Sequence, residues 1–143
     1  MGSANAEELV VSLDARVWIV QADGSRRAAA AQRASPGDLI EYRVTYRNAS
    51  SRVLKQVQAT LPVPPNTTLT PAADGGASVG PTMASRDGQR FEPSPLRDQI
   101  RLPDGRLQWQ DAPLSAYRAL RWPLGDLASG KSKTVTAFVR VLP

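Results

Sequence analysis

Cysteine and histidine are both absent from this chain of 143 residues. Without cysteine there are no disulfides, no thiolate metal ligands and no cysteine nucleophile. Without histidine the chain lacks the commonest general base, the side chain that titrates near neutral pH and the commonest metal ligand. Serine–lysine pairs and carboxylate pairs are therefore the remaining candidates for catalytic groups.

Neither kind of pair has a sequence setting that favours catalysis. A serine–lysine pair is available within residues 129–133, in a predicted turn. Carboxylates gather near one predicted hairpin, where they are typical turn residues: Asp98, Asp104 and Asp111. Calcium loops need several oxygens at short spacing, whereas Asp74 and Asp87 each stand alone. We therefore expect no enzymatic activity, no metal and no cofactor.

Long apolar runs are also missing, and none approaches the ~20 residues that a membrane span needs. We therefore expect no membrane span. The length fits one domain, which we assign to residues 7–143. Residues 1–6 resemble a cloning scar followed by the small-residue pattern of a signal-peptidase site, Ala4-Asn5-Ala6.

Alternation with a period of two is the dominant pattern in the sequence. After the turn residues Pro36-Gly37-Asp38, apolar side chains from Ile40 to Tyr46 alternate with polar ones. The same pattern recurs over residues 11–19, 53–61 and 135–141, and Pro103–Arg106 has the composition of a hairpin turn. Short strands separated by turns predict an all-β, immunoglobulin-like antiparallel β-sandwich of about seven to nine strands.

Pro71–Gln99 is rich in glycine, proline, serine and alanine and shows little alternation. We predict one long loop here, attached to the body by Phe91 and Leu96. Connections of this length are uncommon in compact domains, so a ligand site, if there is one, is expected in this loop or in the loops at the ends of the sandwich.

Several residues have predicted structural roles. Tyr42, Tyr46 and Trp122 are expected to face the core. The side chains of Asp38 and Asn48 are expected to cap turns. A positive φ is expected at two glycines, Gly125 and Gly130.

Three stretches resemble motifs of a known family. They are PGDLIEYRVTYRNAS, ATLPVPPNTTL and LRWPLGDLASGKSKTVTAFVRV. In order and spacing these are similar to the conserved-repeat family of bacterial surface and exported proteins, domain of unknown function number eleven. The matching residues are Pro36, Gly37, Asp38, Tyr42, Asn48, Leu61, Pro62, Trp122, Leu124, Gly125, Leu127 and Gly130.

A subgroup of small, single-domain exported proteins in Gram-negative bacteria is more similar still. It shares a DG turn at Asp23-Gly24, a DG-x-x-F element ending at Phe91, and YRALRW at residues 117–122. The resemblance implies an immunoglobulin-like sandwich, a cleaved signal peptide and residence in the periplasm or at the cell surface. It implies no activity.

The positive charge of the chain comes mainly from arginine, with 18 basic and 13 acidic residues giving a net charge of +5. If the predicted hairpin packs near Tyr117–Trp122, arginine and aromatic side chains would form a local surface, a composition common at protein interfaces. The candidate interaction residues are Arg97, Arg101, Arg106, Trp109, Tyr117 and Arg118.

We therefore predict a non-enzymatic, exported β-sandwich of the bacterial envelope with a structural or protein-interaction role, whose partner is another envelope protein. The alternative is arginine-mediated binding of an anionic polymer: an acidic glycan, lipid head groups or nucleic acid.

Overall fold

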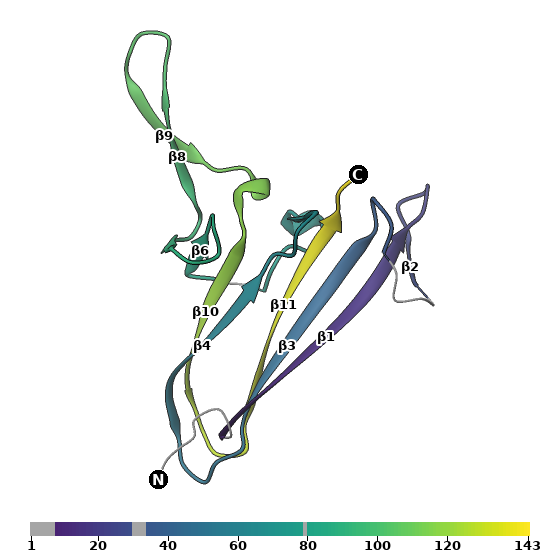
Figure 1. The fold of residues 1–143 in the computed structure, drawn as a ribbon, viewed down its shortest axis with the longest axis vertical. Coiled ribbons are helices and arrows are strands. Elements are labelled where there is room, and N and C mark those ends of the chain that lie inside the picture. Colours follow the sequence, from purple (N-terminus) through teal and green to yellow (C-terminus); the bar gives the residue numbers. More distant parts are fainter. Residues whose placement is uncertain (1–7, 30–33, 79) are drawn as a thin grey trace.

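The computed structural model describes residues 8–29, 34–78 and 80–143. Two antiparallel sheets form the body (Figure 1). The first sheet contains β2 (Arg26–Ala28), β1 (Leu9–Val20), β3 (Leu39–Asn48), β11 (Ser132–Val141) and β5 (Thr67–Leu69), in that order. The second contains β4 (Leu54–Pro62), β10 (Ala119–Leu127), β6 (Met83–Ser85) and β7 (Phe91–Pro93).

A separate two-stranded hairpin, β8 (Arg97–Arg101) and β9 (Leu107–Asp111), projects from the body (Figure 1). Two 3-10 turns, η1 (Ala72–Asp74) and η2 (Leu114–Ala116), complete the elements of the described residues. The predicted all-β sandwich is confirmed, with eleven strands in the described part of the chain instead of the seven to nine expected. Residues 1–6, assigned to a scar and a processing remnant, lie outside the described residues.

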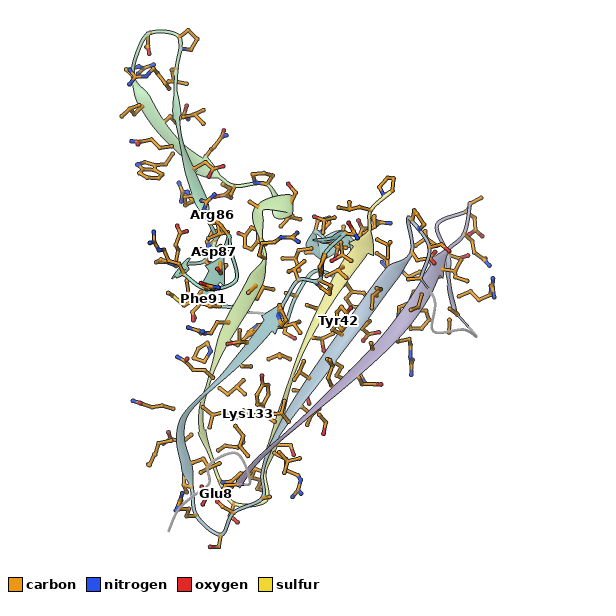
Figure 2. The ribbon with its side chains drawn as sticks, in the orientation of Figure 1. Glu8, Tyr42, Arg86, Asp87, Phe91 and Lys133 are labelled. Atoms are coloured by element: carbon orange, nitrogen blue, oxygen red, sulfur yellow. The ribbon has the colours of Figure 1, made fainter. Side chains whose placement is uncertain are left out.

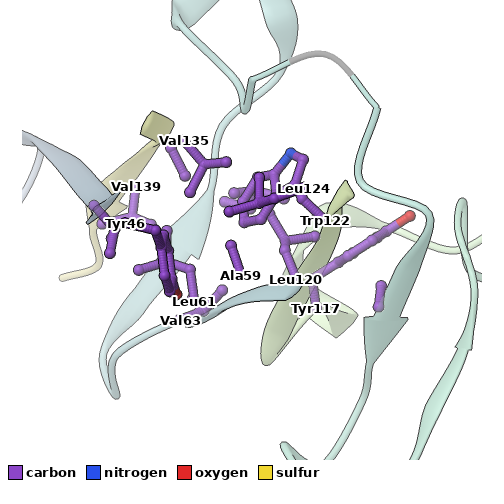
Figure 3. Close-up of a cluster of buried hydrophobic side chains, with 14 of the residues drawn as sticks. Tyr46, Ala59, Leu61, Val63, Tyr117, Leu120, Trp122, Leu124, Val135 and Val139 are labelled. Atoms are coloured by element: carbon purple, nitrogen blue, oxygen red, sulfur yellow. The ribbon is translucent and has the colours of Figure 1, made fainter. Parts of the chain in front are cut away.

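The alternation in β3 places one face of the strand in the core. Val44 and Tyr46 are buried, and the exposed Arg43 and Arg47 lie on the opposite face. Buried side chains of β11, in the same sheet, lie beside them, and buried side chains of β4 and β10 in the second sheet face them across the core (Figure 3). Trp122 is buried as predicted and donates its Nε1–H to the Ser78 carbonyl (3.1 Å). The period of two therefore correctly identified the core face of this strand.

The chain crosses between the two sheets at one end of the sandwich, after β3 and again before β11 (Figure 1). Asn48 is fully buried at this crossing, and its Nδ2 donates to the carbonyls of Leu127 and Arg52 (2.7 Å each). Its Oδ1 accepts the Ser50 N–H (2.9 Å), so the predicted cap is confirmed. Gly130, with the predicted positive φ of 76°, donates its N–H to the Asn48 carbonyl (2.8 Å).

Other predicted turn residues also lie as expected. Asp38 accepts the Ser35 N–H (2.9 Å), and Gly125 has a φ of 72° where β10 bulges against β4. A further link joins the sheets near the same end, where the Lys133 Nζ donates to the Leu124 carbonyl (2.5 Å; Lys133 is labelled in Figure 2).

The prediction of one long loop over Pro71–Gln99 is wrong in one respect. The segment contains two strands of the second sheet. β6 pairs with β10, and β7 pairs with β6. Each strand has only three residues, too few to show a period of two in the sequence. Leu96 is fully buried and attaches the segment to the body as expected, while Phe91 is half-buried beneath the Arg121 guanidinium, 3.7 Å from the ring centroid.

β1 shares the alternation of β3 but lacks its burial. Its Val11 and Leu13 lie directly across from Tyr46 and Val44, on the same face of the first sheet. They nevertheless remain 53% and 62% exposed. The second sheet covers β3 and β11 but does not extend over β1 beyond Leu9, which is half-buried against the core.

Candidate interaction surface

One face of the projecting hairpin carries apolar and arginine side chains together. β8 and β9 pair antiparallel, so that Arg97, Gln99 and Arg101 lie opposite Asp111, Trp109 and Leu107. Directly opposed residues share a face, and these six therefore line the same side of the hairpin. We call this side the hairpin face.

Two large apolar side chains stand out on the hairpin face. Leu107 is 54% exposed and Trp109 is 57% exposed. They are two residues apart on one strand and so point the same way. Exposed apolar side chains that adjoin one another, unlike isolated ones, are typical of binding surfaces.

The base of the hairpin is fixed to the body by a buried contact. Leu96, immediately before β8, donates its N–H to the phenol oxygen of Tyr117 (2.9 Å). Ala112, immediately after β9, donates its N–H to the Leu96 carbonyl (2.8 Å). All three residues are buried. The two strands therefore leave the body from a defined position.

Arg86 also holds the base of the hairpin (Figure 2). Its guanidinium donates to the Asp98 carboxylate (2.8 Å), to the Arg97 carbonyl (2.8 Å) and to the Glu92 carboxylate (3.3 Å). The hydrogen bond to Asp98, followed by the charges of Asp98 and Glu92, raises the pKa of Arg86 above its ordinary value. One cation thus connects β8 to the second sheet.

The turn beside Arg86 is held by Asp87, whose carboxylate accepts the backbone N–H groups of Arg90 and Gln89 (2.8 Å each). These bonds, with a third from the Ser85 hydroxyl, lower the pKa of Asp87 to about 2. The two-residue sequence Asp87-Gly88 therefore has a structural role, since all of these bonds lie within the turn.

The six residues predicted as an interaction surface do not lie together. Arg97, Arg101 and Trp109 lie on the hairpin face. Arg106 lies at the hairpin turn, paired with Asp104 (2.6 Å). Tyr117 and Arg118 belong to the body instead.

Tyr117 is buried, with its hydroxyl engaged by Leu96. Arg118 is half-buried and donates to the Thr67 carbonyl (3.0 Å). The candidate surface is therefore restricted to the hairpin residues.

Sequence reasoning missed Leu107 as a member of this surface, although the signal was present. It lies two residues before Trp109 in a predicted strand, and alternation places both on one face. Sequence reasoning also missed the carboxylate partners of the arginines: Arg97 pairs with Asp111 (3.5 Å).

The segment in which a ligand site, if there is one, was expected lines part of a shallow hollow of about 280 Å³. The described residues that line it include Thr70, Ser78, Ser94, Leu114 and Tyr117, with no carboxylate or basic side chain among them. Such a lining offers no acid–base pair. Within the described residues there is also no cluster of three potential metal ligands and no helix long and apolar enough to cross a membrane.

Comparison of the chain with protein-family models, curated proteins and solved structures finds no match. The resemblance to the conserved-repeat family therefore stays a prediction that depends on the three sequence motifs.

Proposed function

We propose that this protein is a non-enzymatic β-sandwich module of the bacterial envelope that binds another protein through the hairpin face. The observation that carries the proposal is the exposure of Trp109 and Leu107, side by side on an element that projects from the body. Tryptophan and arginine are the residues most enriched at the energetic centres of protein interfaces.

The charges of the hairpin favour a protein partner over an anionic polymer. Arg97 and Arg106 each have a carboxylate partner on the hairpin, and Arg86 at its base has two. A surface that binds phosphates or acidic sugars needs free cations along its length. Here the hairpin alternates positive and negative charge, which suits a mixed polar rim around an apolar centre.

The envelope location is part of the proposal and is supported by the family motifs alone. The partner is accordingly sought among envelope proteins.

The test is a pull-down from an envelope extract with the folded protein as bait, washed at low and then at high salt. Three baits are compared: the unchanged protein, Trp109→Ala, and Gln108→Ala as the matched control on the opposite face of β9. We expect a partner protein to stay bound at high salt to the unchanged protein and to Gln108→Ala. We expect Trp109→Ala to lose it.

If Trp109→Ala retains the partner as well as the unchanged protein does, the hairpin face is not the binding surface. A bound fraction made only of acidic polymers, released by high salt, would replace the proposal by the arginine-mediated alternative.

A further inference from the structure

β1 has an unpaired edge along most of its length. On one side it pairs with β3 from Leu9 to Trp18. On the other, β2 covers only Trp18–Val20. Among the described residues, nothing pairs with this second edge between Leu9 and Arg16. We call this stretch the free edge.

The direction of the backbone groups along the free edge can be read from hydrogen bonds at its two ends. The Val17 carbonyl accepts the Ala29 N–H on the β2 side (2.9 Å). The Glu8 carbonyl accepts the Ala49 N–H on the β3 side (2.7 Å). In an antiparallel sheet, successive residues of a strand direct their N–H and C=O groups to alternate sides. The residues that alternate with Val17 therefore direct these groups to the free edge: Leu9, Val11, Leu13 and Ala15.

The same four residues place their side chains on the inner face of the first sheet, opposite Asn48, Tyr46, Val44 and Tyr42. Leu13 is the most exposed large apolar side chain of the described residues and Val11 is among the most exposed. The edge is therefore both unpaired and apolar, the combination that natural sheets usually protect.

Charge does not protect this edge either, since the charges of β1 are on its outer face and already have neighbours of opposite sign. Asp14 lies opposite Arg43, and Arg16 lies opposite Glu41. A strand added beside β1 would thus meet a balanced outer face and an apolar inner one.

We propose that the free edge pairs with the free edge of a second copy of this chain, antiparallel and centred on Ser12, joining the two first sheets into one. Ser12 is the midpoint of the four outward-directed residues. The arrangement places Leu9 opposite the second copy's Ala15, and Val11 opposite its Leu13. Each pair exchanges two backbone hydrogen bonds, so every outward-directed group gains a partner.

On the outer face this register brings no two like charges together. Glu8, whose carboxylate also pairs with Arg52, comes opposite Arg16 of the second copy, Val10 comes opposite Asp14, and Ser12 faces Ser12. Centring the pair on Asp14 would place two carboxylates face to face, which destabilises a cross-strand pair. It would also oppose Val11 to Val17, whose carbonyl already accepts from Ala29.

A two-fold edge pairing of this kind is closed and stops at the dimer. The proposal goes beyond the proposed function, because it uses β1 and leaves the hairpin face free.

The absence of cysteine allows a direct test of register. In a non-hydrogen-bonded antiparallel pair the two Cα atoms are about 4.5 Å apart, within the range that a disulfide spans. Ser12→Cys should therefore form a disulfide-linked dimer quickly under mild oxidation. Val10→Cys, on the same strand and face, is the matched control. Its two copies would be four residues apart along the strands, roughly 13 Å, so they should not be linked.

A second measurement follows the dimer without cross-linking, by sedimentation over a range of protein concentrations. We expect the unchanged protein and Trp109→Ala to dimerise alike. Leu13→Lys should weaken the dimer about tenfold or more, because it places a charge in the apolar strip twice per dimer. Leu107→Lys, the same change at a similarly exposed leucine of the hairpin, should leave it unaltered.

The proposal is overturned if Val10→Cys is linked as fast as Ser12→Cys, or if the unchanged protein stays monomeric at every concentration.

Discussion

β1 and β3 lie side by side, are paired along almost their whole length and carry the same alternation of side chains. Yet Val44 of β3 is buried, while Leu13, its direct neighbour on β1, is mostly exposed. The difference arises from the second sheet, which covers one strand and not the other. Strand pairing and coverage by a second layer are thus separate properties, and only coverage provides hydrophobic stabilisation.

The largest expected effect is a matched pair of substitutions at these two neighbours. Val44→Asp buries a carboxylate without a partner and should lower the free energy of unfolding by about 4 kcal/mol or more. Leu13→Asp should change it by about 0.5 kcal/mol or less, because the position is already exposed. Urea denaturation of the monomer measures both. Similar losses would show that β1 is covered in solution.

Substitutions of Asn48 test how much its hydrogen bonds at the end of β3 contribute to the free energy of unfolding. Asn48→Ala leaves the buried Leu127 carbonyl without its side-chain donor, at about 1–3 kcal/mol, and removes one of two donors to the Arg52 carbonyl, which keeps the Ser50 hydroxyl. Asn48→Asp is the control, since it keeps an acceptor for Ser50 but cannot donate to the two carbonyls. We expect a loss from the aspartate variant at least as large as that from the alanine variant in chemical denaturation, because it also buries a carboxylate against the two carbonyls. Full stability of the aspartate variant would mean that the donated bonds contribute little.

A smaller effect is expected at Tyr46, whose phenol oxygen accepts the Thr60 N–H of the second sheet (3.3 Å). Tyr46→Phe should cost about 1 kcal/mol, because the ring stays in place and only this hydrogen bond is lost. Tyr42→Phe, on the same face but next to the uncovered part of β1, is the comparison and should cost less. Thermal and urea unfolding would measure the loss of stability in each variant. Equal losses from Tyr46→Phe and Tyr42→Phe would contradict the prediction.

The smallest effect is a difference in the alkaline pH dependence of stability. Burial raises the pKa of the Tyr42 phenol above its ordinary value. The unfolded chain therefore loses this proton first as the pH rises past about 10, which favours unfolding. The contribution of Tyr42 to stability is complete below that pH and is lost above it. Tyr42→Phe should flatten the decline of stability with alkaline pH, and an unchanged slope would show that Tyr42 is solvated.

Local patterns in the sequence predicted those parts of the fold that local chemistry decides. The turn at Pro36–Asp38, the alternation of β3, the cap that Asn48 forms with Ser50 and the hairpin turn near Gly105 all depend on residues close in sequence. Each was predicted and each is present.

Non-local contacts decide the rest, and a single sequence does not show them. β6 is a strand only because β10 lies beside it, and β7 only because β6 does. Tyr117 stands between Ala116 and Arg118, a setting that does not indicate burial, yet Leu96 and the second sheet enclose it. Alternation likewise gave β1 two faces but could not show that the second sheet would stop short of it.

The hairpin depends on the body through its base, at Leu96, Asp98 and Ala112, and not through residues 99–110 beyond it. Substitutions in that outer part would therefore leave the core unchanged. Under the proposed function, partner preference could diverge rapidly at the hairpin during evolution without a matching loss of folding stability. Related chains are accordingly expected to vary most where this one presents Leu107 and Trp109, and to keep the residues that hold the base.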